Sequence, residues 1–403
     1  MHGRDHTLAI AAVRIGTRMP VARPLLAIAN ALSSGAMSLR DVRRHIGQLA
    51  IVGFTGHALP DEVRMIAREF DLAGVIFFAR NVATPEQVAD LSRECQELAD
   101  EVPLWISVDQ EGGRVARLKR PFTEWPAMAT LGRAGAPGDE KLAERFARAL
   151  AAELHAVGIS MDYTPVLDVH TNPKNSVIGD RSLADRAEDV ARLGTAIIGA
   201  LQGAGIAACG KHFPGHGDTS ADSHFEMPLL DHPPDRLDAV ELVPFAAAIA
   251  ADVAAIMTAH ILVPSLDEEL PGTLSARIID GLLRKKMGYQ GLVLSDDMEM
   301  KAISGRYGHS EATVMAIAAG CDAVLMCEPA PAKQIAALEA LIYAVEKGRI
   351  PLQRVEDALA HQMRAKERFL APPRARPATG AALRAILGRD EHQAVAAEMA
   401  RFA

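Results

Sequence analysis

The sequence predicts an α/β protein whose main body is a single (β/α)8 barrel, and two observations point to this fold class. Eight short apolar or β-branched runs alternate along the chain with longer amphipathic segments, which is typical of repeated strand–helix units. The apolar runs are continuous, as burial of a parallel strand on both faces requires. The expected strands are 49–54, 74–79, 104–109, 160–168, 207–213, 254–260, 291–297 and 322–328.

The segments between these strands carry the signals of helix ends. Several open with Pro, Asp or Thr and close on Gly, residues favoured at helix N-termini and C-termini respectively. The expected helices include "TPEQVADLSRECQELADE", "EKLAERFARALAAELHAVG", "LADRAEDVARLGTAIIGALQGAG" and "PDRLDAVELVPFAAAIAAD". A chain of 403 residues is long for one domain, but barrels of this class commonly reach about 250 residues or more as one unit.

The chain is expected to divide into an N-terminal extension (1–45), a barrel domain (46–371) and a C-terminal linker and helix (372–403). The extension contains "RIGTRMPVARPLLAIANALSSGA", which is faintly similar to a secretory signal. However, Pro24 and Asn30 interrupt its apolar part, and it lies well inside the chain. A non-catalytic extension is therefore the favoured interpretation.

Composition excludes several classes of partner. The net charge is −8 and the pI about 6.0, whereas a nucleic-acid-binding surface needs a basic face. No apolar run reaches the roughly 18 residues of a membrane span.

The four cysteines are far apart and form no C-x-x-C pair, which predicts buried thiols. We expect a cytoplasmic protein, or an exported one if the extension acts as a signal; the sequence does not set its oligomeric state, and a monomer is compatible with it.

Polar residues cluster where the expected strands end. In this barrel the loops that follow the strands converge at one mouth, so residues far apart in sequence meet there. The sequence therefore predicts a functional site at the mouth. The strand-end residues are Asp109, Asp168, Lys211, His212, His260, Asp296 and Asp297.

The stretch "SVDQEGGRVARL" (107–118) places Asp109 at a strand end, before two glycines and Arg117. An ionised carboxylate accepts several hydrogen bonds and suits paired sugar hydroxyls, and glycines let the backbone approach a ligand. The alternative is a tight turn in which Asp109 caps local amides.

A second arginine, Arg181, lies in "NSVIGDRSLADR", just before a helix. It either holds a substrate oxygen or pairs with Asp180 or Asp185, and spacing does not decide between them.

Two adjacent carboxylates end the run "GLVLSDDMEM". Successive side chains of a strand point to opposite faces, so only one is expected to face the centre of the mouth easily. Asp296 is closer to the strand and better held, which makes it the favoured reactive group. Asp297 is expected to brace the loop.

The stretch "KHFPGHGDTSADSH" (211–224) allows a zinc site, a phosphate cradle or an acid/base site. An H-x-x-x-H zinc pair needs one helical face, which Pro214 and Gly215 forbid, and a phosphate loop would need G-K-[ST]. The remaining candidate is the pair Asp222 and His224, because a carboxylate that orients an imidazole favours proton transfer near neutral pH. The zinc interpretation would use His212, His216, Asp222 and His224.

Together, "DQEGGRVARL", "KHFPGHGDTSADSH", "MTAH" and "SDDMEM" resemble glycoside hydrolase family 3, most closely its N-acetyl-β-glucosaminidase branch, over roughly residues 48 to 370. The resemblance implies that Asp296 is the nucleophile and that Asp222 and His224 supply the acid/base. It also implies a set of sugar-binding residues: Asp109, Arg117, Arg181, Lys211 and His212.

The reaction that the resemblance implies is a two-step retaining hydrolysis without cofactor or metal. The implied substrate is a peptidoglycan muropeptide with terminal β-1,4-linked N-acetylglucosamine. The longer β-glucosidase relatives take their acid from a second domain, which is not expected after residue 370. The alternatives are a broader exo-hexosaminidase acting on chitin oligosaccharides, an N-acetylglucosamine phosphorylase, a β-glucosidase and a catalytically inactive sugar-binding barrel.

Overall fold

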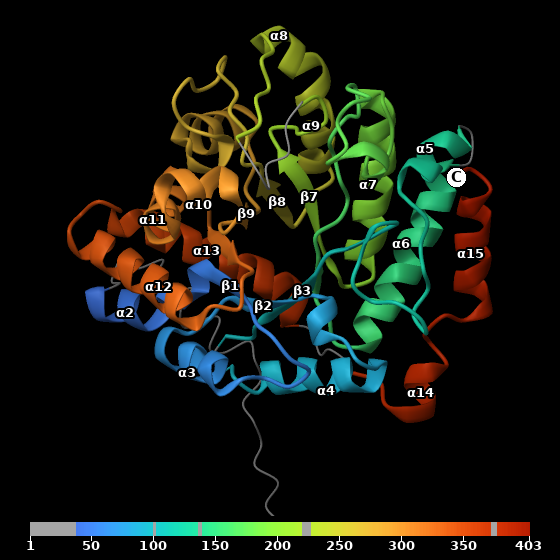
Figure 1. Ribbon diagram of the computed structural model, residues 1–403, viewed down its shortest axis with the longest axis horizontal. Coiled ribbons are helices and arrows are strands. Elements are labelled where there is room, and N and C mark those ends of the chain that lie inside the picture. The colour runs from blue at the N-terminus through green and yellow to red at the C-terminus, as the bar shows by residue number, and fades with distance from the viewer. Residues whose placement is uncertain (1–37, 100–101, 136–138, 220–226, 372–376) are drawn as a thin grey trace, which may run out of the picture.

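The computed structural model describes residues 38–99, 102–135, 139–219, 227–371 and 377–403. Its centre is a closed barrel of parallel strands in the order β1-β10-β9-β8-β7-β6-β3-β2, surrounded by helices (Figure 1). This arrangement confirms the predicted (β/α)8 fold. The barrel strands are β1 (Ala50–Gly53), β2 (Gly74–Phe77), β3 (Trp105–Val108), β6 (Met161–Asp162), β7 (Ala207–Phe213), β8 (Ala255–Thr258), β9 (Leu292–Asp297) and β10 (Ala323–Met326).

Strand β6 is much shorter than the expected run 160–168. Regular pairing ends at Asp162, although the chain continues beside β7 through a single bridge between Val166 and Lys211. Pro165 lies in this stretch and has no N–H to donate to a ladder, so it interrupts the regular pairing.

The outer helices follow the predicted pattern. Helix α4 begins with Pro85 in its first turn, and the Thr84 side chain accepts a hydrogen bond from the backbone N–H of Gln87, as a Thr-Pro start predicts. The main outer helices are α3 (Asp61–Phe70), α4 (Pro85–Gln96), α6 (Asp139–Ala156), α7 (Ala187–Gly203), α9 (Leu242–Ala250), η6 (Arg277–Lys286), α11 (His309–Ala319), α12 (Pro331–Glu346) and α13 (Leu352–Leu370).

One expected helix is irregular. The segment from residue 234 forms α8 (Pro234–Arg236), a π-helical turn η4 (Leu237–Glu241) and then α9. Pro244, in the first turn of α9, lacks the N–H that would donate to the carbonyl four residues earlier, so the regular hydrogen-bond ladder is interrupted between η4 and α9.

The barrel interior is packed and closed at the end where the strands begin. Trp105 lies inside the barrel, its indole N–H donates to Gln362 of α13 at 3.0 Å, and its ring packs against Phe369. Lys366 of the same helix is fully buried and donates to Gln48 at 2.7 Å. A ligand therefore has to enter from the opposite end, where the strands finish.

A small hairpin, β4 (Gln110–Gly112) and β5 (Val115–Ala116), follows β3. Gly112 has φ +114°, and a Cβ there would lie 2.7 Å from the Pro126 carbonyl oxygen. The close approach that this glycine permits is thus to the protein's own chain, whereas the sequence suggested a ligand.

The four cysteines are free and buried, as predicted. Helix α15 (Asp390–Ala400) lies beside α6 (Figure 1), where His392 contacts Glu153 at 2.7 Å. No helix among the described residues has the length and apolar character needed to cross a membrane. The three-part division of the chain stays a prediction.

Candidate active site

A cavity of about 190 Å³ opens at the mouth of the barrel. It brings together the six predicted site residues that the structure describes: Asp109, Arg117, Arg181, Lys211, His212 and Asp296. Apolar side chains form its inner walls, among them Ile76, Met257 and Leu325. The two remaining predicted residues, Asp222 and His224, lie outside the described residues.

Lys211 and Asp109 form an ion pair across the mouth. Lys211 is on β7 and its Nζ donates to Asp109 Oδ1 at 2.9 Å. Arg117 donates to the second oxygen, Oδ2, at 3.2 Å. Burial opposes ionisation of Asp109, but these two cations outweigh it and lower the pKa of the carboxyl group. The predicted alternative, capping of local amides by Asp109, is replaced by contacts with cations.

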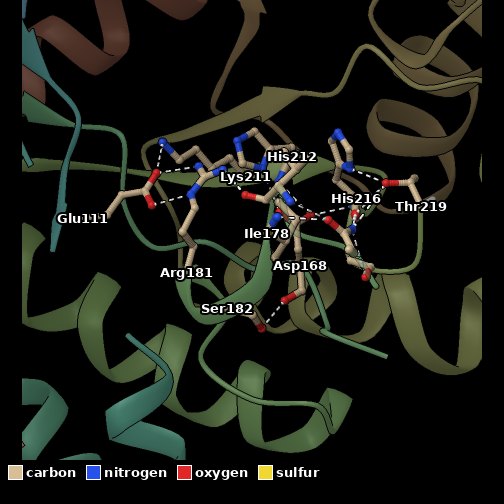
Figure 2. Close-up of polar contacts among 12 residues, drawn as sticks. Glu111, Asp168, Ile178, Arg181, Ser182, Lys211, His212, His216 and Thr219 are labelled. Carbon is tan, nitrogen blue, oxygen red and sulfur yellow. Dashed lines mark hydrogen bonds and ion pairs between the residues drawn. The ribbon is translucent and has the colours of Figure 1, made fainter. Parts of the chain in front are cut away.

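Glu111 is a member of the site that the sequence analysis did not single out. Its side chain is 1% exposed and lies between Lys211, at 2.6 Å, and Arg181 (Figure 2). Burial raises the pKa of Glu111, but Arg181 and Lys211 together hold it well below its ordinary value. Its position in the motif, two residues after Asp109, was the only available signal.

Arg181 pairs with Glu111 and not with the neighbouring acids that the sequence suggested. Its Nε and Nη2 atoms donate to the two carboxylate oxygens of Glu111 at 2.8 and 2.7 Å. Asp180, the adjacent residue, instead lies 3.8 Å from Arg114. Pairing with a neighbouring acid was one of two open alternatives, and the partner found in the structure is 70 residues away in the sequence.

Asp168 orients His212. Its Oδ2 contacts His212 Nδ1 at 2.7 Å, and its Oδ1 accepts the backbone N–H groups of His212 and His216 (Figure 2). Asp168 is fully buried. Burial raises the pKa of its carboxyl group, but the charge and hydrogen bond of His212 have the larger effect and leave the pKa below its ordinary value. With Nδ1 engaged by the carboxylate, Nε2 is the ring nitrogen of His212 available to a ligand.

Asp296 presents an ionised carboxylate to the cavity. Burial works against its charge, but the nearby His212 and His260 lower the pKa of the carboxyl group below its ordinary value. The backbone N–H of Asp297 also donates to Asp296 Oδ1 at 2.7 Å. A buried anion held in one orientation is suited to attack an electrophilic carbon.

Asp297 lines the same cavity, against the expectation of strict alternation along the strand. The register between β9 and β10 shifts there: Ala323 pairs with Leu294, and Leu325 pairs with Asp297. One extra residue on β9 interrupts the alternation, as in a β-bulge. Asp297 also accepts the Glu299 and Cys327 backbone N–H groups, so it braces the loop as expected.

The histidines of the "KHFPGHG" segment have protein partners. His216 Nδ1 contacts the Thr219 hydroxyl at 2.7 Å. Elsewhere in the described part of the chain, Asp218, His232 and Glu241 lie close together, and each offers one atom that could bind a metal ion. Arg236 contacts both carboxylates of that group and already supplies a positive charge.

Comparison with known proteins places this site in a family context. The sequence model of the glycosyl hydrolase family 3 N-terminal domain matches residues 41–365. A β-hexosaminidase A of Pseudoalteromonas piscicida is 37% identical over 66% of this chain and 48% of its own length, so the match spans about half of that relative. A β-hexosaminidase of Nitrosomonas eutropha is 36% identical over 74% of this chain and 87% of its own length.

Solved structures give the same picture. A family 3 β-N-acetylglucosaminidase from Paenibacillus superposes with a TM-score of 0.85 and 43% identity, covering 90% of this chain and 68% of the other. NagZ from Neisseria gonorrhoeae in complex with N-trifluoroacetyl-D-glucosamine superposes with a TM-score of 0.70 and 32% identity, covering 88% and 98%.

Proposed function

This chain belongs to glycoside hydrolase family 3, and from that premise we propose that it is a retaining exo-β-N-acetylglucosaminidase. The observation that carries the proposal is the convergence of Asp296 with five sugar-binding candidates on one cavity. The relatives named as β-hexosaminidases and β-N-acetylglucosaminidases support the choice of sugar.

The cavity suits a single terminal sugar ring. Its inner wall is apolar, and the packed barrel interior closes it behind Met257 and Leu325. Its polar side presents the carboxylate of Asp109, which can accept hydrogen bonds from sugar hydroxyls. It also presents the cations Arg117 and Lys211, which can donate hydrogen bonds to hydroxyl oxygens. A site closed at one end takes the end of a chain, which supports exo cleavage.

The first chemical step follows from the state of Asp296. Its carboxylate attacks the anomeric carbon, the glycosidic C–O bond breaks, and a covalent glycosyl–aspartate forms. The leaving oxygen needs a proton as it departs. In the second step water attacks the same carbon, Asp296 leaves, and the configuration is retained.

We assign the proton transfers to Asp222 and His224, as the family resemblance implies. The protonated imidazole of His224 gives its proton to the leaving oxygen, and the neutral ring then takes one from water. The position of His216 on the cavity wall supports this assignment, because His224 follows it by only eight residues in the sequence. Asp222 would orient the ring and stabilise its charged form.

We propose a peptidoglycan muropeptide as the natural substrate and the cytoplasm as the location, with a role in cell-wall recycling. Family resemblance supports both statements. Chitin oligosaccharides are the alternative substrate; rates on chitobiose and on a GlcNAc–anhydro-MurNAc fragment separate the two. Phosphorolysis is a further alternative, because a neutral imidazole does not repel phosphate and phosphate could replace water in the second step. Adding phosphate and measuring the sugar 1-phosphate tests this alternative.

The decisive experiment for the reaction is Asp296→Ala assayed on p-nitrophenyl N-acetyl-β-glucosaminide. We expect turnover to fall by at least about a thousandfold, because the covalent step loses its nucleophile. Asp280→Ala, at an exposed carboxylate that pairs with Lys285, is the matched control and should act as wild type. Undiminished turnover in Asp296→Ala would remove the nucleophile assignment.

A further inference from the structure

A pair of acidic side chains, Asp297 and Glu299, follows Asp296 at the end of β9. Asp297 Oδ1 and Glu299 Oε2 both accept the backbone N–H of Cys327, at 3.2 and 2.9 Å. Asp297 Oδ1 also accepts the N–H of Glu299 at 3.2 Å. Two carboxyl oxygens that share one donor lie close to each other.

This geometry favours one proton for the two acids. Both are largely buried, and two ionised carboxylates at such a distance repel each other strongly where water is excluded. The pKa of Asp297 is raised, first by burial and then by its hydrogen bond to Glu299 and the negative charge of Glu299. Glu299 shifts the other way: burial raises its pKa, but His309 and Asp297 lower it more.

The surroundings explain which acid keeps the negative charge. His309 Nε2 lies 3.1 Å from Glu299 Oε1, so a cation can face Glu299 on the side away from the cavity. Asp297 faces the cavity beside the charge of Asp296. Several titratable or charged groups surround Asp297. They are Arg80, in the loop after β2, His260, in the loop after β8, Asp296 on β9, Glu299 and Cys327 in the loops after β9 and β10, and His309 on α11.

The backbone of Asp297 connects this pair to the nucleophile. Its N–H donates to Asp296 Oδ1 at 2.7 Å, and its carbonyl accepts from His260 Nε2 at 2.9 Å. The side chain of Asp297 is anchored to the Cys327 N–H at the end of β10. A displacement of Asp297 would therefore turn the carboxylate of Asp296.

We propose that Asp297 and Glu299 hold a single proton between them, and that this proton makes Asp297 a positioning residue for the Asp296 carboxylate. The inference rests on the proposed function, which assigns Asp296 as the nucleophile. Loss of the shared proton places a second negative charge beside Asp296 and drives the two acids apart. The Asp297 N–H then leaves Asp296 Oδ1, and the first chemical step slows.

The test is the pH profile of kcat/KM on a 2,4-dinitrophenyl N-acetyl-β-glucosaminide, whose leaving group needs little acid assistance. Wild type should lose activity on the alkaline side as the shared proton leaves. In Asp297→Asn the amide supplies a permanent hydrogen in place of that proton. We expect kcat/KM to fall by about two- to tenfold at neutral pH, which corresponds to the net free energy of about one hydrogen bond. We expect no loss of kcat/KM on the alkaline side from this pair.

Glu299→Gln is the complementary variant, because it removes the negative charge that keeps the proton on Asp297 and so favours an ionised Asp297. We expect a loss of at least about tenfold at neutral pH, larger than for Asp297→Asn, since a new charge lies beside Asp296. Glu328→Gln is the matched control, because that exposed acid follows the same loop and pairs with Lys333. Its profile should superimpose on that of wild type.

An alkaline limb in Asp297→Asn that superimposes on wild type overturns the inference. If Asp297→Asn does not fold, the infrared band of a protonated carboxylic acid provides the test. The band that wild type shows should be lost in Glu299→Gln, and a band of equal strength in the two proteins would contradict the inference. Asp296→Ala separates this inference from the proposed function. Activity in Asp296→Ala defeats the proposed function, whereas an inactive Asp296→Ala with an unaltered Asp297→Asn profile defeats only the shared proton.

Discussion

Lys211 Nζ lies 2.6 Å from Glu111 Oε1 and joins two acidic side chains that come from the loop after another strand. Lys211 is on β7, and Glu111 is on the hairpin that follows β3. Lys211 is 3% exposed and Glu111 is 1% exposed, so neither charge is solvated by bulk water. The side of the cavity that we propose binds the sugar is therefore a preformed set of buried ion pairs.

Glu111→Gln should weaken substrate binding more than the chemical step. The amide keeps the shape but removes the charge that holds Lys211 and Arg181, leaving two buried cations with one anion fewer. Breaking such a pair typically costs about 3–5 kcal/mol, part of which will appear as lower stability. We expect KM to rise by at least about tenfold with a smaller change in kcat.

Steady-state kinetics on an aryl N-acetyl-β-glucosaminide provide the measurement, and a melting curve separates binding from folding. Glu124→Gln, at a more exposed acid that pairs with Arg120, is the control. A normal KM in Glu111→Gln would show that the pairs do not position sugar-binding groups.

Asp168→Asn should shift the acid limb of the pH profile. His212 lowers the Asp296 pKa, and Asp168 holds the His212 ring by accepting its Nδ1–H. Without the carboxylate charge, the His212 ring is held less firmly beside Asp296, so the Asp296 pKa rises toward its ordinary value. As the proposed nucleophile, Asp296 must be ionised, and activity should therefore be lost at a higher pH than in wild type.

The pH dependence of kcat/KM below neutrality tests this prediction, with Asp185→Asn as control. If the acid limb stays in place while activity falls at every pH, Asp168 acts only on structure.

The strand-end rule explains what the sequence could predict. Asp109, Lys211 and Asp296 were located because parallel barrel strands all finish at one mouth, whatever their distance along the chain. Glu111 and Asp168 were given no role because their partners are protein groups, and pairing between distant loops leaves no local pattern.

The differences between sequence and structure have equally specific causes. For Arg181 the sequence left open a substrate oxygen or a neighbouring acid, whereas its partner comes from another strand end. The alternation argument for Asp297 assumed a regular strand, and the register shift against β10 is a tertiary feature that no period-two pattern reveals. Pro244 was visible in the sequence, but the π-helical turn before it depends on packing.

Asp162→Asn should make the protein less sensitive to alkaline conditions. Burial raises the Asp162 pKa to about 8, and its Oδ2 has no hydrogen-bond partner among the described residues. A folded-state pKa above the unfolded value of 3.8 gives stability that is present in acid and lost as the pH rises toward about 8. The amide removes this loss and keeps the acceptor for the Gln110 N–H.

Urea unfolding at about pH 5 and about pH 8.5 measures the effect. The free energy of unfolding should fall more between these values in wild type than in Asp162→Asn. Parallel changes in the two proteins would mean that Asp162 is ionised in the folded state.

Lys366→Met should abolish a stability gain on the alkaline side. Burial lowers the Lys366 pKa to about 7 from 10.5, so between these values the unfolded chain binds a proton that the folded chain does not. Stability from this group therefore rises with pH across that window and is level below it. Methionine fills a similar volume without a titrating group, although it leaves Gln48 Oε1 without its donor, which costs about 1–3 kcal/mol.

The readout is thus the slope and not the stability at a single pH. Urea unfolding at about pH 7 and about pH 9.5 should show a gain in wild type that Lys366→Met lacks, while Lys141→Met, at an exposed position on α6, keeps the wild-type gain. Equal slopes in wild type and Lys366→Met would mean that the amine stays charged inside the fold. Its contact with Gln48 would then have to stabilise an ammonium ion at the closed end of the barrel.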